Sequence, residues 1–401
     1  MTKTVVIVGA LDTKGKEFEF IKDLVKGQGL QTLVVDFGVM AAPFFTPDIG
    51  RAEVAAAGGG DLSRLSSGEH KDEAMRTMAQ GLAVVVRRLY DEGRLDGIIG
   101  MGGSGGTSIA ASAMRGLPVG VPKLMVSTMG GGDVSPFAGT KDITFMPSIV
   151  DVAGFNRISR RIYANAAGAI AGMVNAEVPA AEEKPLIAAS MFGNTTVAVD
   201  HARELLEAKG YEVLVFHATG TGGRTMEGLI ADGFITGSFD FTTTELADEV
   251  CGGILSAGPE RCLAASRAGV PAVLVPGCVD MANFGGIETV PEKYRGRLLY
   301  QWNPNVTLLR TNVEENRRMG AMLAAAANAA TGRVAVLLPL GGVSMLDAVG
   351  HEFWDPEADR ACFDTIKANL RPGIPLIELP ENINDPAFPE RAVGTLLEML
   401  R

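Results

Sequence analysis

The sequence is poor in the residue types that build disulfide frameworks and metal sites. Among 401 residues there are only four cysteines and four histidines. The cysteines lie far apart, and their spacing fits neither a set of disulfides nor a zinc site. We therefore expect a reduced, cytoplasmic chain with mostly buried thiols. The four are Cys251, Cys262, Cys278 and Cys362.

Positive charge is also scarce, since 36 lysines and arginines stand against 47 acidic residues and the formal net charge is -11. A general binder of nucleic acid or membrane surfaces carries a basic face, so we expect neither partner. The sequence lacks an apolar run of about 18 residues, the length that a membrane-spanning helix needs. It opens with "MTKTVVIVG" and shows no signal peptide. We expect a soluble protein whose ligand is a small molecule.

What the chain has instead is a regular alternation of short apolar runs and helical patterns. Parallel strands that are buried on both faces of a sheet give this sequence pattern. The runs at 4–9 and 97–102 predict two such strands, and the pattern over residues 72–92 predicts a long helix. At 401 residues the chain exceeds the size of one core, and "EVPAAEEKP" (177–185) has the composition of a linker. We predict an α/β fold of two doubly wound, Rossmann-like parallel-sheet domains with an interdomain cleft. Residues 1–178 form the nucleotide-binding domain, and residues 185–401 form the domain on the substrate side.

Three polar loops follow predicted strands of the first domain, and two of them are rich in glycine. They are "GALDTKGKE" (9–17), "GMGGSGGTS" (100–108) and "STMGGGD" (127–133). In parallel sheets, ligands lie outside the carboxyl ends of the strands, where helix N-termini point free amides at anions. We expect a phosphate-bearing ligand at these loops. The alternative is that the glycines only allow tight packing of strand against helix.

Several side chains in these loops suit a nucleotide. Lys14 supplies charge for phosphate, Thr13 offers a hydroxyl, and Asp12 could hold a metal-bound water. Asp133 could orient Mg²⁺ through its waters. Asp36 ends the second strand, at the position from which doubly wound folds reach a ribose. Each has a plain alternative as a helix cap, a solvated lysine or a turn residue.

Two common motifs are absent or incomplete. "GALDTKGK" has one residue too many between its glycines for a Walker A loop. Gly100, Gly102 and Gly105 satisfy G-x-G-x-x-G, but the next strand ends in "VST" and offers no acid for a ribose hydroxyl. An ordinary P-loop is therefore not expected, and an NAD-dependent dehydrogenase is the weakest of the functions considered.

Four stretches of the sequence together resemble the Tm-one-like ATP-binding family. They are "VVIVGALDTKGKE", "IIGMGGSGGTSIA", "MVSTMGGGDV" and "DITFMPSIVDVAGFNRISR". This resemblance extends over nearly the whole chain. It implies two α/β domains and a nucleotide, ATP or ADP, held against the glycine-rich loops. We expect Mg²⁺ to accompany the nucleotide. The binding residues that it implies are Asp12, Thr13, Lys14, Asp36, Gly102, Gly103, Ser104, Gly105, Gly106, Thr107, Thr128, Met129, Gly130 and Gly131.

In the second domain, "HATGTGGRTME" (217–227) and "VPGCVDMANFGG" (275–286) also follow strands. His217 could act as acid or base with Asp280, since histidine often serves in this role. Arg224 could hold a carboxylate or phosphate of a substrate, and Asn283 could add a polar contact. The alternatives are a satisfied buried histidine and ordinary glycine-rich turns.

These features lead to competing functions. The first is an ATP-dependent enzyme, such as a phosphotransferase or ligase, acting on a small carboxylated or phosphorylated metabolite. The second is a nucleotide-binding regulatory protein without turnover. Whether the chain forms a homo-oligomer stays open.

Overall fold

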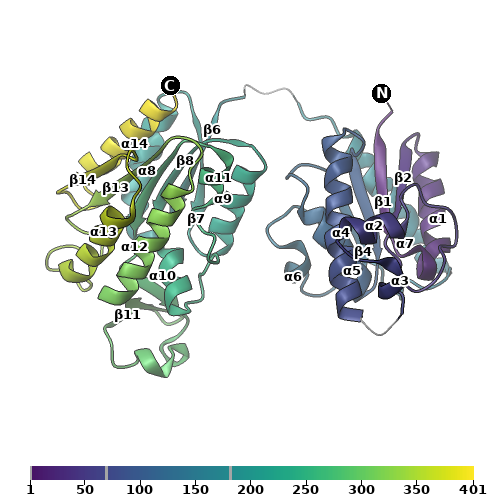
Figure 1. Cartoon of the computed structure of the whole chain (residues 1–401), viewed down its shortest axis with the longest axis horizontal. Coiled ribbons are helices and arrows are strands. Elements are labelled where there is room, and N and C mark those ends of the chain that lie inside the picture. The colour runs from purple at the N-terminus through teal and green to yellow at the C-terminus, as the bar shows by residue number, and fades with distance from the viewer. Residues whose placement is uncertain (1, 68–70, 180–182) are drawn as a thin grey trace. The chain divides into compact units, whose positions relative to one another are not determined.

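The structure, a computed structural model, describes residues 2–67, 71–179 and 183–401. The chain divides into two compact units, Met1–Ala180 and Ala181–Arg401. Of the predicted linker 177–185, residues 180–182 lie outside the described part of the chain. Each unit contains a parallel sheet with helices on both faces, so the prediction of two doubly wound, parallel-sheet α/β domains is confirmed (Figure 1).

The first unit holds a five-stranded sheet in the order β2-β1-β3-β4-β5. All neighbouring strands pair in parallel. The chain leaves β1 toward β2 on one side and later returns to β3 on the other, so the switch point of the sheet lies between β1 and β3. The strands are β1 (Thr4–Gly9), β2 (Gln31–Asp36), β3 (Gly97–Gly102), β4 (Lys123–Ser127) and β5 (Thr144–Pro147).

Alternating side chains of these strands enter two separate hydrophobic layers. Val6 and Val8 pack against the side of α2, α4 and α5, and Val5 and Ile7 pack against the side of α1 and α7. The helices are α1 (Leu11–Gly27), α2 (Arg51–Ala57), α3 (Leu62–Leu65), α4 (Lys71–Asp91), α5 (Ser104–Arg115), α6 (Ser135–Ala138) and α7 (Arg157–Asn175).

The second unit holds a six-stranded sheet in the order β14-β13-β9-β8-β6-β7. Its pairs are again parallel, and the switch point lies between β6 and β8. The strands are β6 (Leu186–Met191), β7 (Glu212–His217), β8 (Ile235–Thr242), β9 (Ala272–Gly277), β13 (Val334–Pro339) and β14 (Leu376–Leu379).

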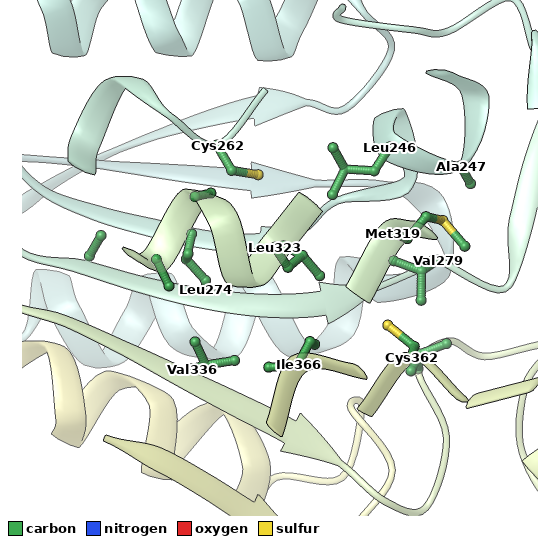
Figure 2. Close-up of a cluster of buried hydrophobic side chains, with 14 of the residues drawn as sticks. Leu246, Ala247, Cys262, Leu274, Val279, Met319, Leu323, Val336, Cys362 and Ile366 are labelled. Atoms are coloured by element: carbon green, nitrogen blue, oxygen red, sulfur yellow. The ribbon is translucent and has the colours of Figure 1, made fainter. Parts of the chain in front are cut away.

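Helices cover both faces of this sheet as well. On one face α8 and α14 pack against Ile187, Phe239 and Val273. On the other face, side chains of α9 to α13 meet Leu274 and Val336, and part of this layer is shown in Figure 2. The helices are α8 (Thr196–Glu207), α9 (Thr221–Ala231), α10 (Thr244–Cys251), α11 (Ala264–Ala268), α12 (Val313–Asn328), α13 (Pro356–Asn369) and α14 (Ala387–Met399), with short 3₁₀ turns η1 (Gly193–Thr195), η2 (Ile287–Thr289) and η3 (Glu292–Tyr294).

A small antiparallel sheet, β10-β12-β11, lies between β9 and α12 in the chain and was not predicted. Its strands have four or five residues each, which is too short for a pattern to be read with ease. They are β10 (Met281–Phe284), β11 (Leu299–Asn303) and β12 (Val306–Arg310).

Candidate functional site

The loops that follow β1 and β3 lie side by side at the switch point of the first sheet. Val8 is in register with Gly100 across the β1–β3 pair, so both strands deliver their loops to the same edge. The loop after β4 is the next along that edge, because Gly102 is in register with Ser127. The three loops predicted to bind phosphate therefore occur on adjacent strands.

The glycine-rich stretch is the start of a helix. Gly103 is the N-cap of α5, and its carbonyl accepts a hydrogen bond from the Thr107 amide at 2.9 Å. The amides of Ser104, Gly105 and Gly106 meet no acceptor among the described residues. Free amides at a helix start attract anions, since the helix dipole adds to their own.

The space around each of these glycines shows whether the glycine is needed for packing inside the chain or leaves room for a ligand. A Cβ on Gly102 would lie 3.1 Å from the Gly106 Cα, so this glycine serves contact between strand and helix. A Cβ on Gly103, Gly105 or Gly106 would meet no protein atom closer than 3.4 Å, and one on Gly131 would meet none within 4 Å. None of these glycines has a positive φ. Neither backbone strain nor packing within the described chain accounts for glycine at these four positions.

The remaining predicted residues of β3 and β4 split into inner and outer groups. Thr107 is buried, and its hydroxyl pairs with the Ser127 hydroxyl at 2.7 Å. Thr128 and Met129 are exposed on the turn after β4, whereas Gly130 packs near the Pro147 backbone. Thr107 therefore joins the start of α5 to the end of β4 inside the unit, whereas Thr128 and Met129 are on the surface.

After β1, the polar side chains mainly hold neighbouring loops. One oxygen of Asp12, Oδ2, accepts the amides of Met40 at 2.8 Å and Ala41 at 3.2 Å. Its other oxygen, Oδ1, is buried without a partner among the described residues. The ammonium of Lys14 donates to the Val152 carbonyl. Thr13 is exposed at the start of α1, so a ligand could reach its hydroxyl directly.

Asp36 is fully buried rather than open to a ribose. Its Oδ1 accepts the Leu11 amide at 3.0 Å and the Gly38 amide at 2.8 Å, and so ties the start of α1 to the turn after β2. Burial raises the pKa of this carboxyl above its usual value, although both amides act in the opposite direction. The arrangement matches the alternative of a turn and capping residue.

Asp133 is exposed, and its carboxylate accepts the Ser135 amide at 2.9 Å at the start of α6. The hydrogen bonds from Ser135 lower the pKa of this carboxyl. This is also the capping alternative.

In the second domain, His217 is exposed at the end of β7 and stacks on Phe192 with ring centroids 5.4 Å apart. It is therefore not a buried, satisfied histidine. Arg224 is exposed on α9, and its Nη1 donates to the Ser256 carbonyl at 2.9 Å. Asp280 follows β9, and β8 and β6 separate β9 from β7. At the usual strand spacing these two strands are about 14 Å apart, so the sheet does not bring His217 and Asp280 together.

The glycine-rich loop after β7 does bind an anion, but the anion belongs to the chain. Oε1 of Glu245 accepts the Gly220 amide at 2.7 Å and the Gly223 amide at 3.0 Å. Its Oε2 accepts Nε of the buried Arg261 at 2.6 Å. Arg261 also pairs with Asp240 and Glu227. Sequence reasoning missed Glu245 because its only signal is its place just after "TTT", two residues into α10.

Asp280 and Asn283 are both fully buried. Oδ2 of Asp280 accepts the Ser344 hydroxyl at 2.8 Å, and burial with the neighbouring Asp347 raises the pKa of Asp280 to about 7. The Asn283 side chain donates to Asp248 at 2.7 Å. Burial raises the pKa of Asp248 to about 7 too. The contacts of Asn283 lie inside the unit and hold β10 against α10.

A cavity that the sequence did not reveal lies in the first domain. Its volume is about 400 Å³. The amphipathic pattern of residues 72–92 predicted the helix behind it, but a core face and a cavity wall have the same pattern. The lining residues are Phe37, Val39, Met40, Leu65, Lys71, Ala74, Met75, Met78 and Ile109.

Residues 2–67, 71–179 and 183–401, the part of the chain that the structure describes, lack both a metal cluster and a membrane-spanning helix. Within these ranges, no cluster of three or more histidine, cysteine, aspartate or glutamate side chains could hold a metal ion. The same ranges contain no helix that is long and apolar enough to span a membrane.

Comparison with known proteins gives matches over both units. The N-terminal domain model of the uncharacterised protein family UPF0261 matches residues 3–179, and its C-terminal domain model matches residues 184–400. A UPF0261 protein of Clostridium tetani is 49% identical over 402 residues and covers 100% of both chains. The ToMV susceptible protein tm-1(GCR26) of Solanum lycopersicum is 36% identical over 420 residues, which cover 98% of this chain and 55% of the tomato protein.

Among solved structures, the UDP-GlcNAc 2-epimerase of Methanocaldococcus jannaschii aligns with 100% of this chain and 93% of its own. The sequence identity is 9% and the TM-score is 0.25. A likeness of this size supports no inference about activity.

Proposed function

We propose, for a chain that belongs to the UPF0261 family over both of its domains, that the first domain binds the phosphates of a nucleotide at the loops after β1, β3 and β4. The resemblance to relatives of the tomato protein, expected from the sequence, is confirmed by the match to tm-1.

One observation carries this proposal. The glycines at 103, 105, 106 and 131 leave space that no part of the described chain fills. Glycine costs backbone entropy wherever it is ordered, so an ordered glycine without a steric reason suggests that something else approaches the backbone. The three free amides at the start of α5 favour an anion there. Their place at the β1–β3 switch point is where doubly wound sheets hold phosphate-bearing cofactors.

An adenine nucleotide with Mg²⁺ is the ligand that we infer. Mg²⁺ is usually held by one or two carboxylates together with nucleotide phosphates. Asp12, through its unpartnered Oδ1, and the exposed carboxylate of Asp133 are the groups that would hold such a metal through its waters. A dehydrogenase is disfavoured, because Asp36 would have to contact the ribose of NAD and is buried instead.

Two roles follow from nucleotide binding. The first is an ATP-dependent phosphotransferase or ligase for a small carboxylated or phosphorylated metabolite, with His217 as the exposed acid or base. The second is regulation by nucleotide without turnover. The internal pairing of Glu245 with the loop after β7 favours the second role, because it fills the amides that a substrate anion would use.

The test of nucleotide binding is a thermal shift of the intact chain with ATP or ADP, with and without Mg²⁺. A ligand at 100 times its Kd should stabilise the protein by about 2.7 kcal/mol through mass action. Absence of any shift at millimolar nucleotide would reject the proposal. Turnover is tested by incubating a metabolite collection with ATP and Mg²⁺ and following ADP release and product masses.

A further inference from the structure

An apolar cavity opens beside the glycine-rich start of α5. Its volume is about 400 Å³, within the range of small-molecule sites. The cavity is lined by residues of the turn after β2, of α3 and α4, and by Ile109 of α5. Among the lining residues that the structure describes, Lys71 alone has a charged side chain, and the others are apolar.

The cavity and the free amides share one face of α5. Gly105 and Ile109 are four residues apart on this helix, so they lie one above the other, about 6 Å apart along the axis. A Cβ on Gly105 would lie 3.4 Å from Cε of Met75, which also lines the cavity. A ligand whose anionic end meets the Gly105 amide would therefore have its other end beside Met75 and Ile109.

The turn after β2 gives a second link between the cavity and the phosphate loops. Met40 lines the cavity and is 64% exposed, while its amide donates to Asp12 at 2.8 Å. Asp12, the residue after β1 that could hold a metal-bound water, therefore also holds the turn that forms one wall of the cavity. Met40 stands at the surface, where it could pack on a bound group.

The lining suits a flat aromatic ring. Met40, Met75 and Met78 bring three thioethers to one cavity, and sulfur makes favourable contacts with aromatic rings. Phe37 adds an aromatic surface against which a ring can pack. We propose that this cavity holds the purine base of the nucleotide whose phosphates lie at the start of α5, an inference that rests on the function proposed above.

This assignment carries a consequence for specificity. Among the lining residues that the structure describes, none has a carboxylate or carboxamide side chain, so none of them offers a strong acceptor for the N–H donors that distinguish one purine edge from another. Apart from the Lys71 ammonium, recognition of the base by these residues then rests on surface contact. We expect ATP and GTP to bind within about fivefold of each other, and both to bind more tightly than inorganic tripolyphosphate, which has no base.

The decisive variant is Met75→Trp in the intact chain, which fills the cavity from a half-buried position on α4. The matched control is Val84→Trp, on the same helix at a side chain that is 54% exposed. We expect Met75→Trp to lower ATP affinity at least tenfold in calorimetric titration, with tripolyphosphate affinity changed less than twofold. The control should change neither affinity.

Met40→Ala, at an exposed position, gives a second variant whose folding is not at risk. This variant should lower the affinity for ATP severalfold and leave the affinity for tripolyphosphate unchanged. Equal loss of ATP and tripolyphosphate, or no loss of ATP in either folded variant, would overturn the base pocket while nucleotide binding stands. If the unmodified protein binds neither ATP nor tripolyphosphate, the proposed function fails and the pocket assignment fails with it.

Discussion

At the scale of single residues, the glycines of the first domain have two different physical causes. A Cβ on Gly9 would lie 2.1 Å from the Phe18 ring, and one on Gly38 would lie 2.5 Å from Asp12. These glycines are required by contacts inside the chain. Gly105 and Gly131 have no such contact. The two kinds look alike in the sequence, because the neighbour that excludes a Cβ is distant along the chain.

Gly105→Val should therefore affect binding and not folding. The added side chain would stand among the free amides at the start of α5 and keep phosphate away from them. We expect at least a tenfold loss of ATP affinity, about 1.4 kcal/mol, with an unchanged melting temperature. Gly168→Val is the control, since Gly168 is an exposed helical glycine of α7 with open space around its Cα. A folded Gly105→Val protein that binds ATP normally would place the phosphates elsewhere.

The contribution of Asp280 to the free energy of unfolding depends on pH. Its pKa is raised from 3.8 to about 7, chiefly by burial and by Asp347, while Arg310 and Ser344 favour the charged form. Between these two pH values the folded state binds a proton that the unfolded chain releases. The contribution of this group to stability is therefore full at low pH and is lost as pH rises through 7.

Asp280→Asn should remove that loss. The amide oxygen can still accept the Ser344 hydroxyl, and no buried charge forms. The free energy of unfolding of the variant should equal that of the natural protein near pH 4 and exceed it increasingly up to about pH 8, by on the order of 4 kcal/mol. Urea unfolding at a series of pH values measures this difference. Two stability curves that stay parallel across the range would show that Asp280 does not titrate in the folded state.

At the scale of elements, the loop after β7 shows how an anion-binding pattern can be satisfied from within. Gly223 leaves no room for a Cβ, which would lie 2.2 Å from Oε2 of Glu245. The carboxylate also compensates the buried Arg261, so one side chain joins α9, α10 and the segment before α11. A buried ion pair that loses one partner leaves an uncompensated charge, which is costly.

Glu245→Gln should consequently destabilise the second unit by about 3 kcal/mol, because the amide NH₂ of glutamine would face Nε of Arg261 or the loop amides. The measurement is the urea midpoint of the intact chain. Glu260→Gln is the matched control, since Glu260 pairs with Arg267 at a side chain that is 70% exposed, and its midpoint should not move. An unchanged midpoint in Glu245→Gln would mean that Asp240 and Glu227 suffice for Arg261.

The elements themselves were largely predictable, and their contacts were not. The runs at 4–9 and 97–102 are strands with the predicted bounds, because strands buried on both faces are continuously apolar. Asp36 was correctly placed at a strand end, yet its side chain turns inward to the Leu11 amide. Pairings such as Glu245 with Gly220 join residues 25 positions apart, and no periodic pattern reports them.

At the scale of the whole molecule, the two units have separate hydrophobic cores. The clusters of the first unit draw on buried residues between Val5 and Val174. Those of the second draw on residues between Ile187 and Leu396. A ligand of the first unit should therefore stabilise that unit's own elements directly. This gives a test of location that does not depend on any substitution.

Hydrogen exchange of the intact chain, read by mass spectrometry with and without saturating ATP and Mg²⁺, measures that location. The amides of Ser104, Gly105 and Gly106 have no acceptor among the described residues, so they should exchange rapidly in the free protein. Bound phosphate would give them acceptors and slow their exchange at least tenfold. Peptides covering residues 10–14, 37–40 and 128–131 should also slow, whereas those covering 184–400 should change little. Protection confined to the second unit would refute nucleotide binding at α5, because a ligand slows the exchange of the amides that it contacts.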